Sequence, residues 1–445
     1  MEMNAYEHDN AAQNFNTFQP AVKPPFIITK TDVIIALLSF AMGYLFLRRF
    51  NDFYMSYDVD RTTSRIVLNL LFLALVTVLT EIQFHARKKS AESRVWFACL
   101  LFSSAGVIFD LTGVWSIVQI VLFQSGFFVL WLLSRAGILL EGQSSHLFPV
   151  DAFNGFITIP FASFGLRART LFTAARTRRK TSKKSDGLRI GLTVSVLFLC
   201  IPLFCLSIRF LRNADAAFAD WLDRKLNSVY LAGDLLNFFF AFLLSVPIGA
   251  YLHGLIGGAK RKPLEKLEQQ KARTYRFLAF LKKVPAGVWV AVIGIFSLLY
   301  AMFFAFQTGY LLGAFRGQLP EGFIVSEYAR RGFFELCKVS VVNFVLLWLA
   351  TRTGECTEHG RTAIRIVSVV LLVENLLFST ISLSKLVMYI RTFGFTPRRL
   401  ESSWLVCVIF AACAGWMINI LSDKPVFRKW LFFSAVSLSL LCLVP

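Results

Sequence analysis

Acidic residues, histidines and paired cysteines are all scarce in this chain of 445 residues, and each scarcity excludes a class of protein. Eight cysteines occur without a single Cys-x-x-Cys pair, which is atypical of a disulfide framework, and most lie in apolar runs as small core residues. Cys356 and His359 form a lone C-x-x-H, too few ligands for a metal site. We therefore expect neither a metal nor another cofactor.

Familiar catalytic motifs are also missing. The glycine-rich stretch "GLIGGAKRKP" lacks the G-x-x-x-x-G-K-[ST] spacing that wraps backbone amides around phosphates. The sequence contains no G-x-S-x-G, no H-E-x-x-H and no protein-kinase signature set. We assign no catalytic residue, and an enzyme is the less favoured class.

What the chain has in abundance is hydrophobic sequence, 56% of its residues, arranged in long uninterrupted runs. Such runs match the roughly 20 residues that a helix needs to cross a bilayer, and they lack the alternation of barrel strands. We predict an all-α, polytopic transmembrane helical bundle of about eleven spans. The predicted spans are 32–48, 66–84, 95–109, 114–134, 190–211, 235–256, 286–314, 333–350, 362–390, 403–421 and 430–445.

The net charge of +20 follows from 47 Lys and Arg against 27 Asp and Glu. Two strongly basic loops, 167–189 and 260–283, predict by the positive-inside rule that the N-terminus is inside and the C-terminus outside. The expected partners are membrane lipids, through anionic headgroups at the cytoplasmic face. No nucleic-acid-binding module accompanies the charge, so we expect no nucleic acid. A protein partner is not identified.

The spans divide the chain into four predicted regions. Residues 1–31 form a polar cytoplasmic tail that we expect to be disordered, followed by an uncleaved first span. Residues 32–135 form a four-span region and residues 136–189 a basic cytoplasmic interfacial segment. In that segment, the apolar face of 148–172 should lie in the membrane interface and break near Pro160. Residues 190–445 form the C-terminal membrane region.

The stretch "SEYARRGFFELCK", from Ser326 to Lys338, places charged residues beside a hydrophobic run. At helical spacing Glu327, Arg331 and Glu335 share one face, with Arg330 beside them. Charges that enter hydrocarbon are costly unless they face protein or water, so they indicate either a ligand site or a structural clamp, at even odds. Paired guanidinium groups suit a phosphate or carboxylate ligand.

Two charges lie within predicted spans, Lys338 in the eighth and Glu374 in the ninth. These spans are joined by a short loop, and each charge lies 13 residues from it, or about 20 Å. Each alone would cost about 2.5–3.5 kcal/mol near the bilayer centre. We predict that Lys338 and Glu374 form an interhelical pair, with Asn343 and Asn375 nearby.

Three segments in order, "FQTGYLLG", "SEYARRGFFEL" and "YIRTFGFTPRR", resemble the motifs of a bacterial membrane-protein family catalogued as domain of unknown function 4173, with the 4153 group as relatives. The resemblance covers roughly the C-terminal two-thirds of the chain. It implies a multi-pass protein of the bacterial cytoplasmic (inner) membrane and brings no reaction with it. By motif match it selects Gln307, Tyr310, Gly313, Glu327, Tyr328, Arg330, Arg331, Gly332, Glu335, Tyr389, Gly394, Thr396 and Arg399.

Three functions remain open. The favoured one is binding or transport of an anionic or lipidic envelope compound at an outward-facing Arg/Glu site. Its candidate ligand residues are Gln307, Glu327, Tyr328, Arg330, Arg331, Glu335 and Arg399. The alternatives are a membrane sensor or assembly subunit without transport, and a membrane transferase that uses Glu327 or Glu335 as a general base.

Overall fold

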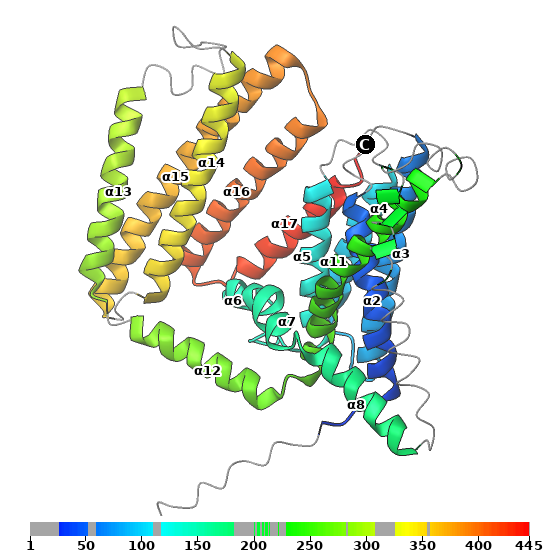
Figure 1. The fold of residues 1–445 in the computed structure, drawn as a ribbon. Helices are drawn as coiled ribbons and strands as arrows, with labels where there is room; N and C mark the ends of the chain where they lie inside the picture. The colour runs from blue at the N-terminus through cyan, green and yellow to red at the C-terminus, as the bar shows by residue number, and fades with distance from the viewer. Residues whose placement is uncertain are drawn as a thin grey trace, which may run out of the picture.

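The computed structural model describes residues 26–51, 59–109, 117–181, 228–281, 284–307, 325–353 and 357–444, with a few positions between 200 and 221. Every regular element in these ranges is a helix (Figure 1). The first half contains α2 (Lys30–Asn51), α3 (Val59–Phe84), α4 (Ala91–Phe109), α5 (Ile117–Arg135), α6 (Phe148–Phe153), the π-helix η2 (Asn154–Thr158), α7 (Ile159–Ala162) and α8 (Leu166–Thr181). The second half contains α11 (Ser228–Arg261), α12 (Leu264–Leu281), α13 (Ala286–Gln307), α14 (Val325–Thr353), α15 (Glu358–Phe393), α16 (Pro397–Ser422) and α17 (Phe427–Leu441).

Seven helices in the described part of the chain are long and apolar enough to cross a membrane, which makes this a multi-pass membrane protein. They cover Lys30–Arg49, Ile66–Phe84, Phe238–Arg261, Ala286–Phe306, Arg330–Arg352, Glu358–Phe393 and Arg398–Ser422. Each corresponds to one of the predicted spans. The predicted spans at 95–109, 114–134 and 430–445 correspond to α4, α5 and α17, which fall outside this set. Most of the predicted span 190–211 lies outside the described residues.

The helices form two groups, each around its own hydrophobic core (Figure 1). One core joins α2, α3, α4 and α5 to α11 and α17, and the other joins α13 to α16. The helix α17 packs on both α4 and α16 and so connects the two groups. The late helices α11 and α17 therefore complete the core of the N-terminal spans, a grouping that the order of the sequence does not indicate.

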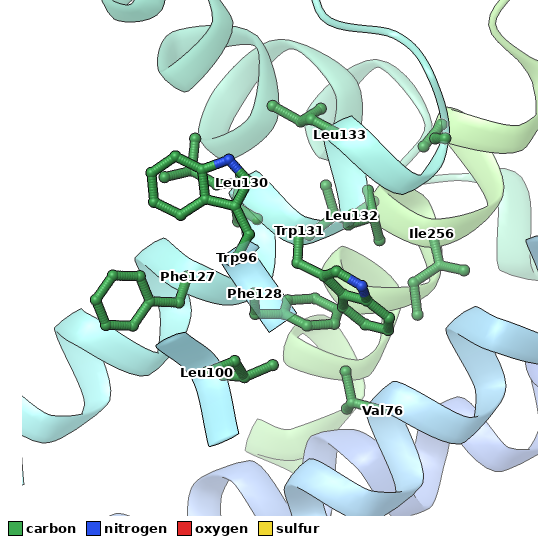
Figure 2. Close-up of a cluster of buried hydrophobic side chains, with 14 of the residues drawn as sticks. Val76, Trp96, Leu100, Phe127, Phe128, Leu130, Trp131, Leu132, Leu133 and Ile256 are labelled. Carbon is green, nitrogen blue, oxygen red and sulfur yellow. The ribbon is translucent and has the colours of Figure 1, made fainter. Parts of the chain in front are cut away.

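The N-terminal core is built around large aromatic side chains (Figure 2). Trp131 is 1% exposed and lies beside Phe128, with ring centroids 5.9 Å apart. Val76 and Ile256 reach the same cluster from α3 and α11. Between helices in a bilayer such side chains act through close van der Waals packing, so this cluster fixes α5 against α3 and α11.

Two segments place apolar side chains on the outside, at one end of the molecule. Phe153 and Phe161 of the α6–α7 segment are 57% and 62% exposed, as expected of an interfacial helix. The backbone stays helical through Pro160. The helix ends at Ser163, where φ is −109°, which is three residues after the predicted break. The amphipathic helix α12 also exposes Phe277 and Phe280.

A chain of buried polar groups crosses the four helices of the C-terminal core. The hydroxyl of Tyr300 in α13 donates to Asn343 Oδ1 in α14 at 2.7 Å. Asn343 in turn donates to Asn375 Oδ1 in α15 at 3.1 Å, and Asn375 donates to Cys413 Sγ in α16 at 3.2 Å. Because buried polar groups are costly without partners, this series of hydrogen bonds fixes the depth of each helix relative to the next.

Candidate functional site

The charged stretch predicted from the sequence forms the first turns of α14. Arg330 and Arg331 are both exposed there. One helical turn further, Lys338 Nζ donates to Glu335 Oε1 at 2.8 Å, and both side chains are at least 60% exposed. An exposed i,i+3 pair contributes only a few tenths of a kcal/mol, so these charges do little for the stability of the helix itself.

Lys385 of α15 brings a further cation to this end of α14. Its side chain is only 6% exposed, and its Nζ lies against the backbone of Gly332. A Cβ at position 332 would overlap the Lys385 side chain, which gives a physical reason for a glycine in "YARRGFFEL". Lys385 was not among the residues predicted from the sequence, although a lone lysine in the apolar run "STISLSKLVM" is the signal that could have identified it.

The segment "YIRTFGFTPRR" turns the chain from α15 into α16 and positions Arg399. Gly394 has φ of +78°, a left-handed conformation that L side chains rarely adopt, so the turn requires glycine. The turn places the Arg399 guanidinium 4.4 Å from the ring centroid of Tyr389. The Nη1 atom of Arg399 is buried and has no hydrogen-bond partner among the described residues.

These residues form one group, which we call the Arg330 cluster. It comprises Arg330, Arg331, Glu335 and Lys338 of α14, Lys385 and Tyr389 of α15, and Arg399 of α16. The cluster is linked by the contact of Lys385 with Gly332 and by the stacking of Arg399 on Tyr389, one turn along α15 from Lys385. Its formal charge is strongly positive, which favours an anion.

Three predicted members of the site lie outside what the structure describes. The side chains of Gln307, Glu327 and Tyr328 belong to residues whose surroundings are not described. A site shared by Glu327 and Arg399 therefore stays a prediction. Glu335, by contrast, is placed, and its partner is Lys338.

The structure gives Lys338 and Glu374 partners other than the predicted ones. Lys338 binds Glu335 of its own helix, and Glu374 accepts a hydrogen bond from Ser297 Oγ of α13 at 2.8 Å. No ion pair joins Lys338 to Glu374 in the part of the chain that the structure describes.

The relative depth of α14 and α15 explains why Lys338 and Glu374 do not form the predicted pair. α14 and α15 do pack together as neighbours, but the Asn343–Asn375 hydrogen bond sets them level at those residues. Lys338 is then level with a residue about five positions after Asn375. At about 1.5 Å per residue, Glu374 lies roughly 9 Å along the helix axis from the level of Lys338, and each side chain has a nearer partner.

Metal chemistry finds no support in the described part of the chain. No group of three or more His, Cys, Asp or Glu side chains there could hold a metal ion. Cys356, one half of the C-x-x-H pair, lies outside the described residues.

Comparison with known proteins gives one match. A family model described as "Domain of unknown function (DUF4153)" matches residues 95–445, which include most of α4, every later helix and all three motifs quoted above. Neither the curated proteins nor the solved structures contain a match. The matched region begins further towards the N-terminus than the motifs indicated.

Proposed function

This chain belongs to the DUF4153 family, and from that premise we propose that it binds an anionic, lipid-like compound of the bacterial cell envelope at the Arg330 cluster. The observation that carries the proposal is the contact of Lys385 with Gly332 of α14, together with Arg399 stacked on Tyr389 one turn further along α15. Cationic groups of three helices lie at this end of the molecule. The only carboxylate with a described position in the cluster, Glu335, is already bound to Lys338.

The cations of the cluster match an anionic ligand in charge and in geometry. Guanidinium groups such as those of Arg330 and Arg331 bind phosphate and carboxylate oxygens in a bidentate manner. An anionic headgroup therefore fits the chemistry of the cluster better than a neutral ligand.

Sidedness connects the cluster to the envelope. The positive-inside rule places the first turn of α14 on the outer face of the cytoplasmic membrane. Transport of the bound compound would need a continuous path along α14 to α16. A sensor or assembly subunit would need the cluster only as a clamp, and a transferase would need a free carboxylate base, which the Glu335–Lys338 pair disfavours.

The test is retention of lipid by gently extracted protein, measured by native mass spectrometry. We expect the unmodified chain to carry one more anionic lipid than the double variant Arg330→Gln/Arg331→Gln, in which the species with that additional lipid falls at least ten-fold. The matched control is Lys424→Gln, which removes an exposed charge at the other end of α16. Equal retention by the double variant and the control, with unchanged melting temperatures, would overturn the proposal.

A further inference from the structure

A second candidate site lies at the opposite end of the C-terminal helices. A cavity of about 1350 Å³, open to the outside, lies between the second half of α14, the first turns of α15, α16, the start of α17 and the segment 141–149. Pockets for ordinary small molecules have volumes of roughly 300–1,000 Å³. The cavity is thus large enough for a ligand bigger than a typical metabolite.

The mouth of the cavity is cationic. Its lining includes five basic side chains and two acidic ones, Glu141 and Asp423. Both acids are already engaged, since Asp423 pairs with Arg365 and Glu141 accepts a hydrogen bond from Tyr275. Burial and the nearby Arg352 lower the pKa of His146, so this imidazole is neutral at pH 7.

Three of the basic residues at the mouth are not in a close ion pair, although Glu141 lies near enough to Arg352, and Asp423 to Arg361, for an electrostatic interaction. Arg428 donates to Glu92 Oε2 at 3.1 Å, which leaves Arg352, Arg361 and Lys429. Among the residues that the structure describes, no ion pair joins any of these three to a carboxylate. An anionic group at the mouth would be attracted to all three.

The body of the cavity is apolar and aromatic. Phe344 and Trp416 stack there with centroids 5.9 Å apart, and Trp348 and Trp430 line the wall beside them. Val341 and Val345 belong to the same lining and are 59% and 52% exposed. Because α14 spans the membrane, this exposed apolar flank gives hydrocarbon chains a lateral route into the cavity.

We propose that this cavity binds a phospholipid with an anionic headgroup. The phosphate is held by Arg352, Arg361 and Lys429 at the mouth, and the acyl chains lie against Phe344, Trp348 and Trp416. This site is separate from the Arg330 cluster, since the two lie at opposite ends of a helix of 29 residues, about 43 Å long. The inference therefore goes beyond the proposed function and does not depend on it.

Three features favour a phospholipid over other occupants. A free phosphate or a nucleotide would use the cations but leave the apolar body without a ligand. A neutral lipid would fill the body but not use the three cations. Trp348 is one helical turn from Arg352, and Trp430 is next to Lys429, so tryptophans adjoin the cations in sequence, as is typical at membrane interfaces.

The tryptophans also provide the assay. The full chain in detergent is titrated with short-chain phosphatidylglycerol that carries brominated acyl chains, and quenching of tryptophan fluorescence reports binding. We expect saturable quenching that weakens at least ten-fold in the double variant Arg352→Gln/Arg361→Gln. The brominated phosphatidylcholine analogue should bind at least ten-fold more weakly than phosphatidylglycerol to the unmodified chain.

Two further variants test the site. Lys424→Gln, which removes an exposed charge that does not line the cavity, should leave the quenching curve unchanged. Ala412→Trp, which fills the cavity body without touching its charges, should abolish the saturable phase; it serves as the second variant if removal of the arginines lowers the melting temperature. Equal binding of the two lipids, or competition by inorganic phosphate at the concentration of the lipid, would overturn the proposal.

Discussion

At the scale of single residues, two glycines set the closest approach between helices. A Cβ at Gly43 of α2 would lie 2.7 Å from the backbone nitrogen of Gly249 in α11, and a Cβ at Gly249 would overlap the carbonyl oxygen of Ser39. Backbone atoms cannot move aside as a flexible side chain can. Small residues at such a crossing let two membrane helices pack backbone to backbone.

We expect Gly43→Ala to destabilise the protein by about 1–3 kcal/mol, the usual cost of overpacking. The matched control is Gly126→Ala in α5, where an added Cβ meets nothing within 4 Å. That control should be neutral or slightly stabilising, because alanine favours helix more than glycine does. Unfolding by SDS titration measures both, and equal stability of the two variants would contradict the close crossing.

A single buried carboxyl group makes the stability of the folded protein depend on pH. Asp151 of α6 is 1% exposed, and its Oδ1 accepts a hydrogen bond from the Leu140 backbone at 3.0 Å. Burial raises the pKa of Asp151 from 3.8 to about 6, despite this hydrogen bond and the charge of nearby Lys262. Glu141 and Glu92 act in the same direction as burial.

The folded protein holds this proton more tightly than the unfolded chain does. The contribution of Asp151 to the free energy of unfolding therefore falls as pH rises from about 4 to about 6. The variant Asp151→Asn lacks this titration and keeps an oxygen for Leu140. Relative to the unmodified protein, it should gain up to about 3 kcal/mol between pH 4 and pH 8. Melting curves across that range measure the difference, and a constant gap would contradict a raised pKa.

At the scale of helices, hydrophobic runs predict the spans and leave their relative depth open. The length of a run is a local property, so 66–84 and 403–421 correspond to α3 and α16. The depth of α14 against α15 depends on tilt and on the Asn343–Asn375 contact, neither of which is visible in one sequence. The prediction of a Lys338–Glu374 pair assumed that residues equally far from the connecting loop lie at equal depth, and this assumption was wrong.

The polar chain through the C-terminal core predicts non-additive mutational effects. Asn343→Leu removes the partner of both Tyr300 and Asn375, so it should cost about 1–3 kcal/mol. Tyr300→Phe should cost less once Asn343 is already leucine, because no buried hydroxyl is then left without a partner. A double-mutant cycle in SDS measures the coupling. Strictly additive costs would contradict a connected chain.

Part of the candidate site could be predicted from the sequence, because some of its residues are close together along the chain. Arg330, Arg331, Glu335 and Arg399 are adjacent in short motifs, and their unusual place beside an apolar run drew attention to them. Lys385 and the cavity at the far end of α14 depend on how distant segments pack. The loop 141–149 reaches the cavity only because α12, α14 and α17 all contact it.

At the scale of the whole molecule, four segments distant in sequence meet at one end. Tyr275 of α12 donates to Glu141, Trp348 of α14 donates to the His146 carbonyl oxygen at 3.4 Å, and Arg428 of α17 donates to Gln143 at 2.8 Å. These contacts place 141–149, α12, the end of α14 and the start of α17 on the same side of the membrane. The start of α14 and the end of α15 lie at the other end (Figure 1).

The basic loops then predict which side is which. Residues 167–189 and 260–283 should face the cytoplasm by the positive-inside rule, and the shared contacts carry 423–426 with them. In a variant without native cysteines, Lys180→Cys and Lys424→Cys should resist an impermeant maleimide in intact cells and react after lysis. Gln318→Cys, in the segment between α13 and α14, should react in intact cells. Labelling of residues 180 and 424 but not 318 in intact cells would mean that the orientation is inverted and that the Arg330 cluster lies at the cytoplasmic face. If residues 180 and 424 behaved differently from each other, the result would contradict the packing that places them on the same side of the membrane.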